Sequence, residues 1–148
     1  MHVVVCGSLA FTEQFGELKQ QLEALGHEVT LPVTAQEILD GTADRSVEEL
    51  ESMKASGTHY ERTAHYDAIR RYHKLLIKGD AVLVANYEKK DLPGYIGGNT
   101  FLEMGFAHVE DIPIFTLFEP SASLPYIDEI RAMQPTTIQH LSELKTAG

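Results

Sequence analysis

The sequence predicts an α/β fold in which helices cover both faces of a mostly parallel sheet. Short apolar runs alternate along the chain with longer segments in which apolar residues recur at helical spacing. Two of these runs, residues 2–6 and 80–86, are apolar almost throughout, which is typical of strands covered on both faces of a parallel sheet. Strands that alternate with helices favour a doubly wound topology, whose ligand site lies beyond the carboxyl ends of the strands.

The remaining elements follow from periodicity and from the residues that interrupt it. Phe15, Leu18 and Leu22 lie on one face of a helix that ends at Gly26. The expected strands are residues 2–6, 27–31, 80–86, 112–118 and 136–138. The expected helices are residues 12–25, 59–78, 100–108 and 124–133. Together they predict a single flavodoxin-like domain over residues 1–148, with a five-stranded, mostly parallel sheet flanked by helices.

Residues 33–58 carry the weakest pattern in the chain. Thr34 and Ser46 are each followed three residues later by a glutamate, which is the signature of a capping box at a helix start. Gly41 and Gly57 interrupt the segments that follow. We therefore expect short surface helices here, and a mobile flap over a ligand site is one interpretation of them.

Composition excludes several classes of partner. Twelve Lys and Arg face 22 Asp and Glu in 148 residues, which gives a formal charge of −10. Such a surface repels polyanions, so we expect no nucleic-acid polymer and no anionic membrane as a partner. A small phosphorylated ligand remains compatible with this charge, because the free N–H groups at a helix start bind phosphate.

The N-terminal region and the lone cysteine indicate where the protein works. The first residues lack a basic segment, and their apolar run is too short for a signal peptide or a membrane span, so we expect a cytoplasmic protein. Cys6 is the single cysteine, which excludes a disulfide within the chain. Its position at the end of an apolar run favours a small core residue over a reactive thiol.

The run GGNTFLEMGFA, residues 97–107, places one carboxylate among apolar side chains. Because burying an unpaired carboxylate is costly, Glu103 should have a structural or a chemical role. The structural alternative is a capping box formed by Thr100 and Glu103 at the helix start. The chemical alternative is attack on a substrate. The helix itself is apolar around its circumference, so we expect it to be buried.

Three segments should meet at the carboxyl edge of the sheet. Gly7 and Ser8 follow the first strand, Asn86 follows the third, and residues 97–103 approach the same edge from a glycine-rich loop. Glycines let a backbone approach a ligand closely, and a helix start presents free N–H groups with partial positive charge. The sequence therefore predicts a binding site where these segments converge.

The same features resemble a known enzyme family. A first strand that ends in CGS, an apolar strand that begins with Asp80, and a glycine-containing loop that runs into LEMGFA follow one another in this order. This arrangement resembles the nucleoside 2-deoxyribosyltransferase superfamily, which includes the 2'-deoxynucleoside 5'-phosphate N-hydrolases. The resemblance implies that Glu103 is the nucleophile that attacks C1' of the sugar. The residues that it places around the sugar or its 5'-phosphate are Gly7, Ser8, Gly97, Gly98, Asn99 and Thr100.

One position departs from the family pattern. The family carries an Asp on the helix before the strand that Asp80 begins, and the matching position here holds Tyr72, with His73 beside it. Either side chain could donate a proton or a hydrogen bond to the leaving base, although an aromatic residue on a packed helix face is more often core. Asp67 lies further back among basic residues, where a surface ion pair with a neighbour such as Arg70 is expected.

No pattern indicates a metal or a cofactor. The histidines His59, His65, His108 and His140 lack ligand spacing, and the chain has no Walker-type glycine loop. The function that we expect is cleavage or transfer at the N-glycosidic bond of a (deoxy)nucleoside or nucleoside 5'-monophosphate, through a covalent glycosyl–enzyme intermediate on Glu103. The alternative is a non-catalytic nucleotide-binding module on the same fold.

Several choices stay open at the level of sequence. They are ribose against deoxyribose, the identity of the base, the need for a 5'-phosphate, and water against a second base as acceptor. The family resemblance also implies a homodimer or higher homo-oligomer, in which a neighbouring subunit completes the pocket.

Overall fold

A computed structural model describes residues 1–144 and shows an α/β fold built on one five-stranded sheet. The strand order is β2-β1-β3-β4-β5, and every neighbouring pair is parallel. The strands are β1 (His2–Cys6), β2 (Glu28–Thr30), β3 (Ala81–Val84), β4 (Ile114–Thr116) and β5 (Thr136–Thr137). The predicted fold class is confirmed. The observed strands are mostly shorter than the apolar runs, although flanking residues such as Ala85 and Leu117 still donate backbone hydrogen bonds to a neighbouring strand.

The order in which strands are added to the sheet switches sides at β1. The connection from β1 leads to β2 on one side, whereas β3, which comes later in the chain, pairs with β1 on the other side. Cys6 lies opposite Val84, so the carboxyl ends of β1 and β3 stand next to each other. A switch of this kind opens a crevice at the carboxyl edge of a parallel sheet.

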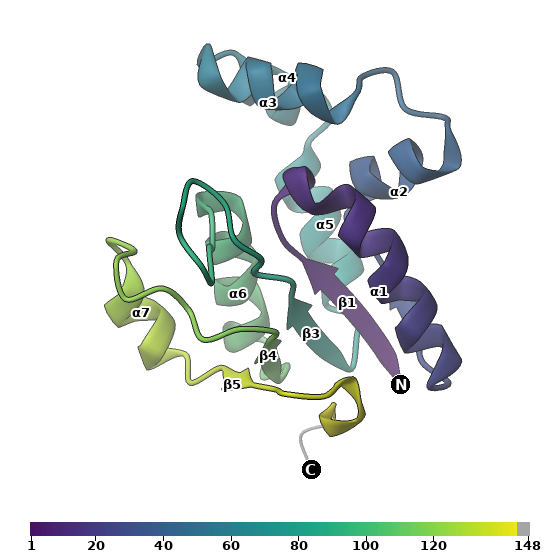
Figure 1. The fold of residues 1–148 in the computed structure, drawn as a ribbon. Coiled ribbons are helices and arrows are strands. Elements are labelled where there is room, and N and C mark those ends of the chain that lie inside the picture. The colour runs from purple at the N-terminus through teal and green to yellow at the C-terminus, as the bar shows by residue number, and fades with distance from the viewer. Residues whose placement is uncertain (145–148) are drawn as a thin grey trace.

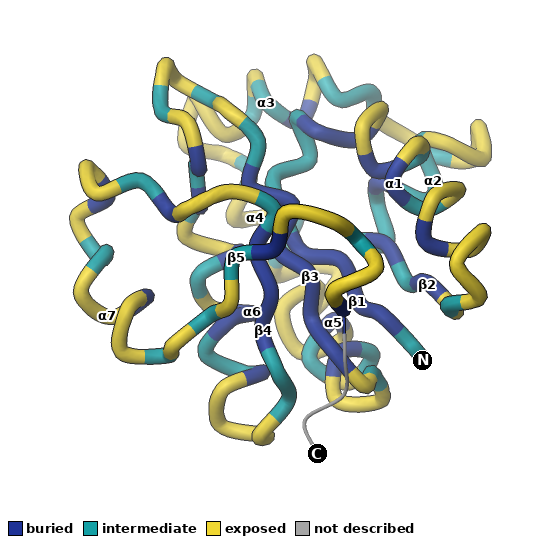
Figure 2. Tube along the Cα trace, turned by 60° about the horizontal axis from the view of Figure 1, so that its bottom comes forward, coloured by how far each residue is buried: buried dark blue, intermediate teal, exposed yellow. Residues whose placement is uncertain are grey.

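Side chains alternate between two apolar layers, as the period of a strand requires. Val3 and Val5 pack toward α1, whereas Val4 and Cys6 pack toward α5, α6 and α7. Figure 2 shows that the strands form the buried centre of the molecule, with exposed residues on the surrounding loops and helices. Cys6 therefore belongs to the layer that also receives α6, the helix that carries Glu103.

Helices and two short 3-10 turns, η1 and η2, connect the strands. They are η1 (Leu9–Phe11), α1 (Thr12–Ala24), α2 (Val33–Asp40), α3 (Val47–Ala55), α4 (His59–His65), α5 (Ala68–Leu76), α6 (Gly98–Val109), α7 (Ile127–Ala132) and η2 (Leu141–Glu143). The two short helices expected in the weakly patterned region are present as α2 and α3. Figure 1 shows α3 and α4 lying past the arrowhead of β1, at the carboxyl edge of the sheet.

The single long helix predicted over residues 59–78 is wrong, because the chain breaks into α4 and α5. Asp67 adopts a left-handed conformation, with φ of 49° and ψ of 42°, and ends the helical hydrogen bonding at that point. Asp is among the few residues that occupy this region without a glycine, so no breaker marked the position in the sequence. The expected ion pair is present, since Arg70 Nη1 lies 2.7 Å from Asp67 Oδ2.

The outer face of α6 also differs from expectation. Leu102 is 46 % exposed and Val109 is 78 % exposed, so this helix is buried on one face only. Met104 and Ala107 supply the buried face and pack against the strands. None of the helices within residues 1–144 has the length and apolar character that crossing a membrane requires.

Candidate active site

A cavity of about 750 Å³ lies at the carboxyl edge of β1 and β3, within the usual range for small-molecule sites. Its walls come from the loop after β1, the start of α6 and the helices α2 to α5. The predicted site residues that line it are Gly7, Ser8, Tyr72, Gly97, Gly98, Asn99, Thr100 and Glu103. Asn86 and His73 are not among its lining residues.

Glu103 is an almost fully buried carboxylate, 5 % exposed, on the wall of this cavity. Asn99 Nδ2 donates a hydrogen bond of 3.2 Å to Oε1, while Oε2 is buried with no hydrogen-bond partner among residues 1–144. Burial raises the pKa of this carboxyl group to about 8, and the Cys6 thiol beside it opposes part of that rise. One carboxyl oxygen of Glu103 is therefore buried without a hydrogen bond from the described residues.

The capping interpretation of Glu103 is wrong. The helix begins at Gly98 with Gly97 as its N-cap, and no side chain closes that end. Thr100 and Glu103 consequently lie inside the helix rather than across its first turn. Ser46 provides the contrast, because its hydroxyl does accept a hydrogen bond of 3.1 Å from the Glu49 N–H at the start of α3.

The same spacing also occurs at Thr34 and at Thr58, which Glu61 follows three residues later, and neither threonine makes a capping hydrogen bond. Thr34 lies within α2, whose N-cap is Pro32, and Thr58 is the N-cap of α4 without a side-chain hydrogen bond. The same spacing therefore marks a true cap at one helix and nothing at the others. The pattern depends on where the backbone leaves its helical conformation, which local spacing does not determine.

Tyr72 and Cys6 enclose the buried side of Glu103. The Tyr72 hydroxyl donates to the backbone carbonyl of Val5, which ties α5 to β1. Burial raises the pKa of Tyr72, and the charges of Cys6 and Glu103 raise it further. The pKa of the Cys6 thiol is also raised, first by burial and then by the Glu103 charge. Both groups stay protonated at neutral pH, so Cys6 behaves as the core residue that the sequence suggested.

The loop after β1 is held in place by packing and by a lysine. A side chain at Gly7 would place Cβ 2.9 Å from the Phe15 ring and 3.0 Å from the Ala85 carbonyl oxygen, so only glycine fits. Ser8 caps the short turn that follows, accepting a hydrogen bond from Ala10. Its hydroxyl also accepts a hydrogen bond of 2.9 Å from Lys89 Nζ.

Asn86 has a different role from the one predicted. Its side-chain oxygen accepts hydrogen bonds from the N–H groups of Leu117 and Phe118, and its amide nitrogen donates to the Phe118 carbonyl. These bonds use the amide to join the segments that follow β3 and β4. His73 likewise faces away from the cavity, against the Phe106 ring and 3.8 Å from a Glu110 oxygen.

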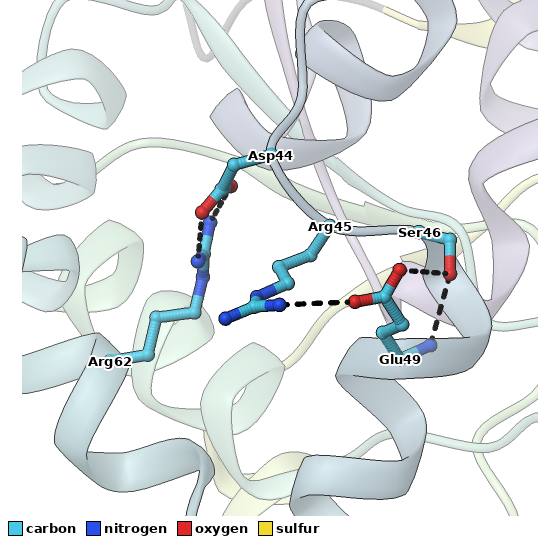
Figure 3. A network of polar contacts seen from close by, with 5 residues as sticks. All are labelled: Asp44, Arg45, Ser46, Glu49 and Arg62. Atoms are coloured by element: carbon cyan, nitrogen blue, oxygen red, sulfur yellow. Dashed lines mark hydrogen bonds and ion pairs between the residues drawn. The ribbon is translucent and has the colours of Figure 1, made fainter.

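Charged residues between α2 and α4 line one wall of the cavity, and the sequence did not single them out as site residues. Arg62 makes two hydrogen bonds to Asp44, of 2.8 and 2.6 Å, and thereby lowers the pKa of that carboxyl group to about 2. Figure 3 shows this pair beside the contacts of Arg45 and Ser46 with Glu49. The partners come from different elements, so no local pattern in the sequence pointed to them.

Comparisons with known proteins do not assign the chain to a family. No protein-family model, curated protein or solved structure matches the chain. Within residues 1–144, no group of three or more His, Cys, Asp and Glu side chains is placed to hold a metal ion. The geometry of the cavity and the motif that contains Glu103 are therefore the features that bear on function.

Proposed function

We propose that this protein cleaves, or transfers at, the N-glycosidic bond of a (deoxy)nucleoside or nucleoside 5'-monophosphate, with Glu103 as the nucleophile. The observation that carries the proposal is the buried Glu103 carboxyl group, which lines a large cavity and keeps one oxygen without a hydrogen bond among residues 1–144. A buried oxygen without a hydrogen bond destabilises the fold, which is typical of a group kept for chemistry. The resemblance of LEMGFA to the deoxyribosyltransferase motif supports the same assignment.

The chemistry needs one carboxylate beneath the sugar. A carboxylate oxygen of Glu103 forms a bond to C1' while the bond from C1' to the base nitrogen breaks, and the base leaves with the electron pair and takes a proton from water. Water or a second base then attacks C1', which releases Glu103 and regenerates the enzyme. This is the retaining strategy of glycosidases, in which positive charge develops at the anomeric carbon and a carboxylate traps it.

Protonation of Glu103 governs this reaction. With a pKa of about 8, the free protein holds the group mostly as the neutral acid at pH 6. The nucleophilic form gains population as the pH rises toward 8, so kcat/KM should increase over that interval. A positively charged sugar in the transition state favours the ionised form, because opposite charges close together lower a carboxyl pKa.

The alternative function, a nucleotide-binding module without catalysis, draws support from one observation. The Tyr72 hydroxyl donates to a backbone carbonyl and His73 lies outside the cavity, so neither is placed to protonate the leaving base. The Tyr72 hydrogen bond instead fixes α5 against β1 beside Glu103. An enzyme of this kind would require a base that leaves without help from these two side chains.

The test is the Glu103→Gln variant, assayed for base release from a panel of nucleosides and nucleoside 5'-monophosphates. Gln keeps the shape and the Asn99 contact but is a far poorer nucleophile, so base release should fall roughly a thousandfold or more. Glu13→Gln is the matched control, because Glu13 is an exposed glutamate in the first turn of α1. A wild-type protein that is inactive on the whole panel would leave the binding module as the function.

We also propose that the protein is a homo-oligomer, as the family resemblance implies. The exposed side chains of Leu102 and Val109 on α6 give such a contact an apolar surface. Size-exclusion chromatography at micromolar concentration tests this, and elution as a monomer would exclude it.

A further inference from the structure

Three lysines gather on one side of the cavity, and we call them the lysine rim: Lys54 of α3, and Lys89 and Lys90 from the loop after β3. One carboxylate lies among them. Glu51 Oε2 is 2.9 Å from Lys89 Nζ, and Glu51 Oε1 is 3.6 Å from Lys54 Nζ. Two of the three ammonium groups thus share one carboxylate, in a chain whose formal charge is −10.

The rest of the cavity lining does not neutralise the excess positive charge of the lysine rim. Its lining holds five cationic side chains, Lys54, Arg62, Arg71, Lys89 and Lys90, and four carboxyl groups, Glu37, Asp44, Glu51 and Glu103. Asp44 is occupied by Arg62, and Glu103 is mostly neutral below pH 8. At neutral pH the lining therefore carries two more positive than negative charges, which matches the charge of one phosphate dianion.

The backbone holds two of these lysines in a strained turn. Residues 89–92 form a tight turn closed by hydrogen bonds of 3.2 and 2.9 Å between Lys89 and Leu92. Lys90 and Asp91 at its centre both have positive φ, of 53° and 59°, without a glycine at either position. Such strain costs about 1–3 kcal/mol for each residue and collects at ligand sites, where the surroundings enforce it.

An aromatic ring links the lysine rim to the start of α6. The ammonium groups of Lys89 and Lys90 lie 5.6 and 5.7 Å from the centre of the Tyr95 ring. The same ring lies against Gly97, where an added Cβ would be 3.4 Å from the Tyr95 hydroxyl oxygen. Gly97 is the N-cap of the helix that carries Glu103, so the rim and the nucleophile belong to one continuous wall.

The effect of the neighbouring charges is resolved at Lys54, whose side chain is 37 % exposed. The pKa of Lys54 is lowered, first by burial, and the charges of Lys89 and Lys90 lower it further against the opposing effect of Glu51. Glu51 Oε1 is itself buried without a hydrogen bond among residues 1–144. Ammonium groups held close together in this way gain from an added anion with several acceptor oxygens.

We propose that the lysine rim binds the phosphate group of the substrate, so that this protein acts on a nucleotide rather than a free nucleoside. This inference rests on the proposed function for the nucleoside part of the ligand. Lys89 and Lys90 approach the phosphate from the strained turn, and Lys54 approaches it from α3. The sugar then extends along the wall toward Glu103.

Binding is tested on the Glu103→Gln protein, which separates affinity from turnover. Isothermal titration calorimetry compares a nucleoside 5'-monophosphate, the matching nucleoside and inorganic phosphate. The monophosphate should bind at least tenfold more tightly than the nucleoside, and its affinity should fall as salt increases. Inorganic phosphate that binds as tightly as the nucleotide would overturn the inference, because a simple anion site would then explain the lysines.

The variant Lys90→Gln removes one charge from the rim without touching Ser8 or Glu51. It should weaken binding of the monophosphate by roughly 10- to 100-fold, since a hydrogen bond to a charged group is lost. The affinity for the nucleoside should be unchanged. Lys89→Gln should give the same selective loss, and Lys74→Gln, an exposed lysine of α5, is the control. Equal weakening of both ligands by the rim variants would overturn the inference.

The two proposals fail in distinguishable ways. Selective nucleotide binding by a wild-type protein that releases no base would reject catalysis and keep the phosphate site. Base release from nucleosides as fast as from nucleotides would reject the phosphate site and keep catalysis.

Discussion

The cavity is built from two regions of opposite character. Its floor, formed by β1, β3 and α6, consists of strands whose side chains are nearly all buried and of a helix that buries a carboxylate. Its roof, formed by α2, α3 and α4, has little core of its own. Leu50 is the buried residue of α3, and no residue of α4, which the structure describes in full, is buried.

This difference separates stability from recognition. The floor draws its stability from apolar burial in a layer that water does not reach, and it can hold the unfavourable Glu103 carboxylate for that reason. The roof is held by ion pairs such as Asp44–Arg62 and by Lys89–Glu51, which joins it to the loop after β3, and these are weak in water. Changes in the floor should therefore alter the whole fold, whereas changes in the roof should alter binding.

The largest expected effect is a pH-dependent stability difference between wild type and Glu103→Gln. Because the folded pKa of about 8 exceeds the ordinary 4.5, the folded protein keeps a proton that the unfolded chain loses between these values. Wild-type stability from this group is complete below pH 4.5 and falls as the pH rises to about 8. At about 1.4 kcal/mol for each pKa unit, the loss is on the order of 5 kcal/mol.

Gln has no titrating proton, so the stability of the variant should rise relative to that of the wild type as the pH increases. Urea unfolding at pH 5 and at pH 8.5 measures both proteins, and the change in their difference isolates the carboxyl group from any fixed cost of the amide. A difference in the free energy of unfolding that does not vary with pH would show that Glu103 is not protonated in the fold.

The second effect concerns the apolar packing of the floor. Leu83→Ala removes a fully buried side chain from the central strand β3, and it should lower the free energy of unfolding by about 2–5 kcal/mol. Thermal unfolding followed by circular dichroism should show one transition at a lower temperature. Loss of less than about 1 kcal/mol would mean that the sheet core is less tightly packed than its burial indicates.

The third effect concerns the roof. Leu50→Ala removes the buried contact of α3, so this helix should loosen while the sheet remains folded. Hydrogen exchange should then accelerate in residues 47–55 and remain slow in β1 and β3. Uniform acceleration of exchange across the strands would show that roof and floor unfold together. The two regions would then not differ in stability.

The smallest effect is expected from Asp44→Asn. The pair with Arg62 is well formed, but the Asp44 side chain is half exposed, so water and salt screen its contribution. The melting temperature should change little, and any change should shrink at high salt. A large loss of stability that persists at high salt would assign Asp44 to the structural core.

Local pattern was sufficient for the elements that bury a continuous apolar face. The strand at His2–Cys6 and the helix with Phe15 and Leu22 were predictable because their side chains repeat with the period of the structure that they form. Glu103 stood out as a candidate site residue for the opposite reason, as a charge that interrupts such a pattern. The break at Asp67 was not predictable, because it is a backbone conformation that no glycine or proline announced.

Long-range contacts decide how two further candidate residues are used. Asn86 was predicted to face a ligand from its place after a strand, yet its amide bonds to Leu117 and Phe118, which lie far along the chain. Tyr72 was predicted to be either core or a proton donor, and its hydroxyl is engaged by the Val5 carbonyl. Both outcomes depend on which backbone groups the folded sheet brings within reach.

The sequence by itself determined the α/β architecture, the carboxyl-edge location of the site and the candidacy of Glu103, since each depends on neighbours within a few residues. Only the tertiary structure decided that Glu103 is not a helix cap, that one of its oxygens has no hydrogen bond among residues 1–144, and that Lys54 and Lys89 share one carboxylate. The physical reason is that burial and charge are properties of what surrounds a side chain. Those surroundings come from segments that only folding brings together.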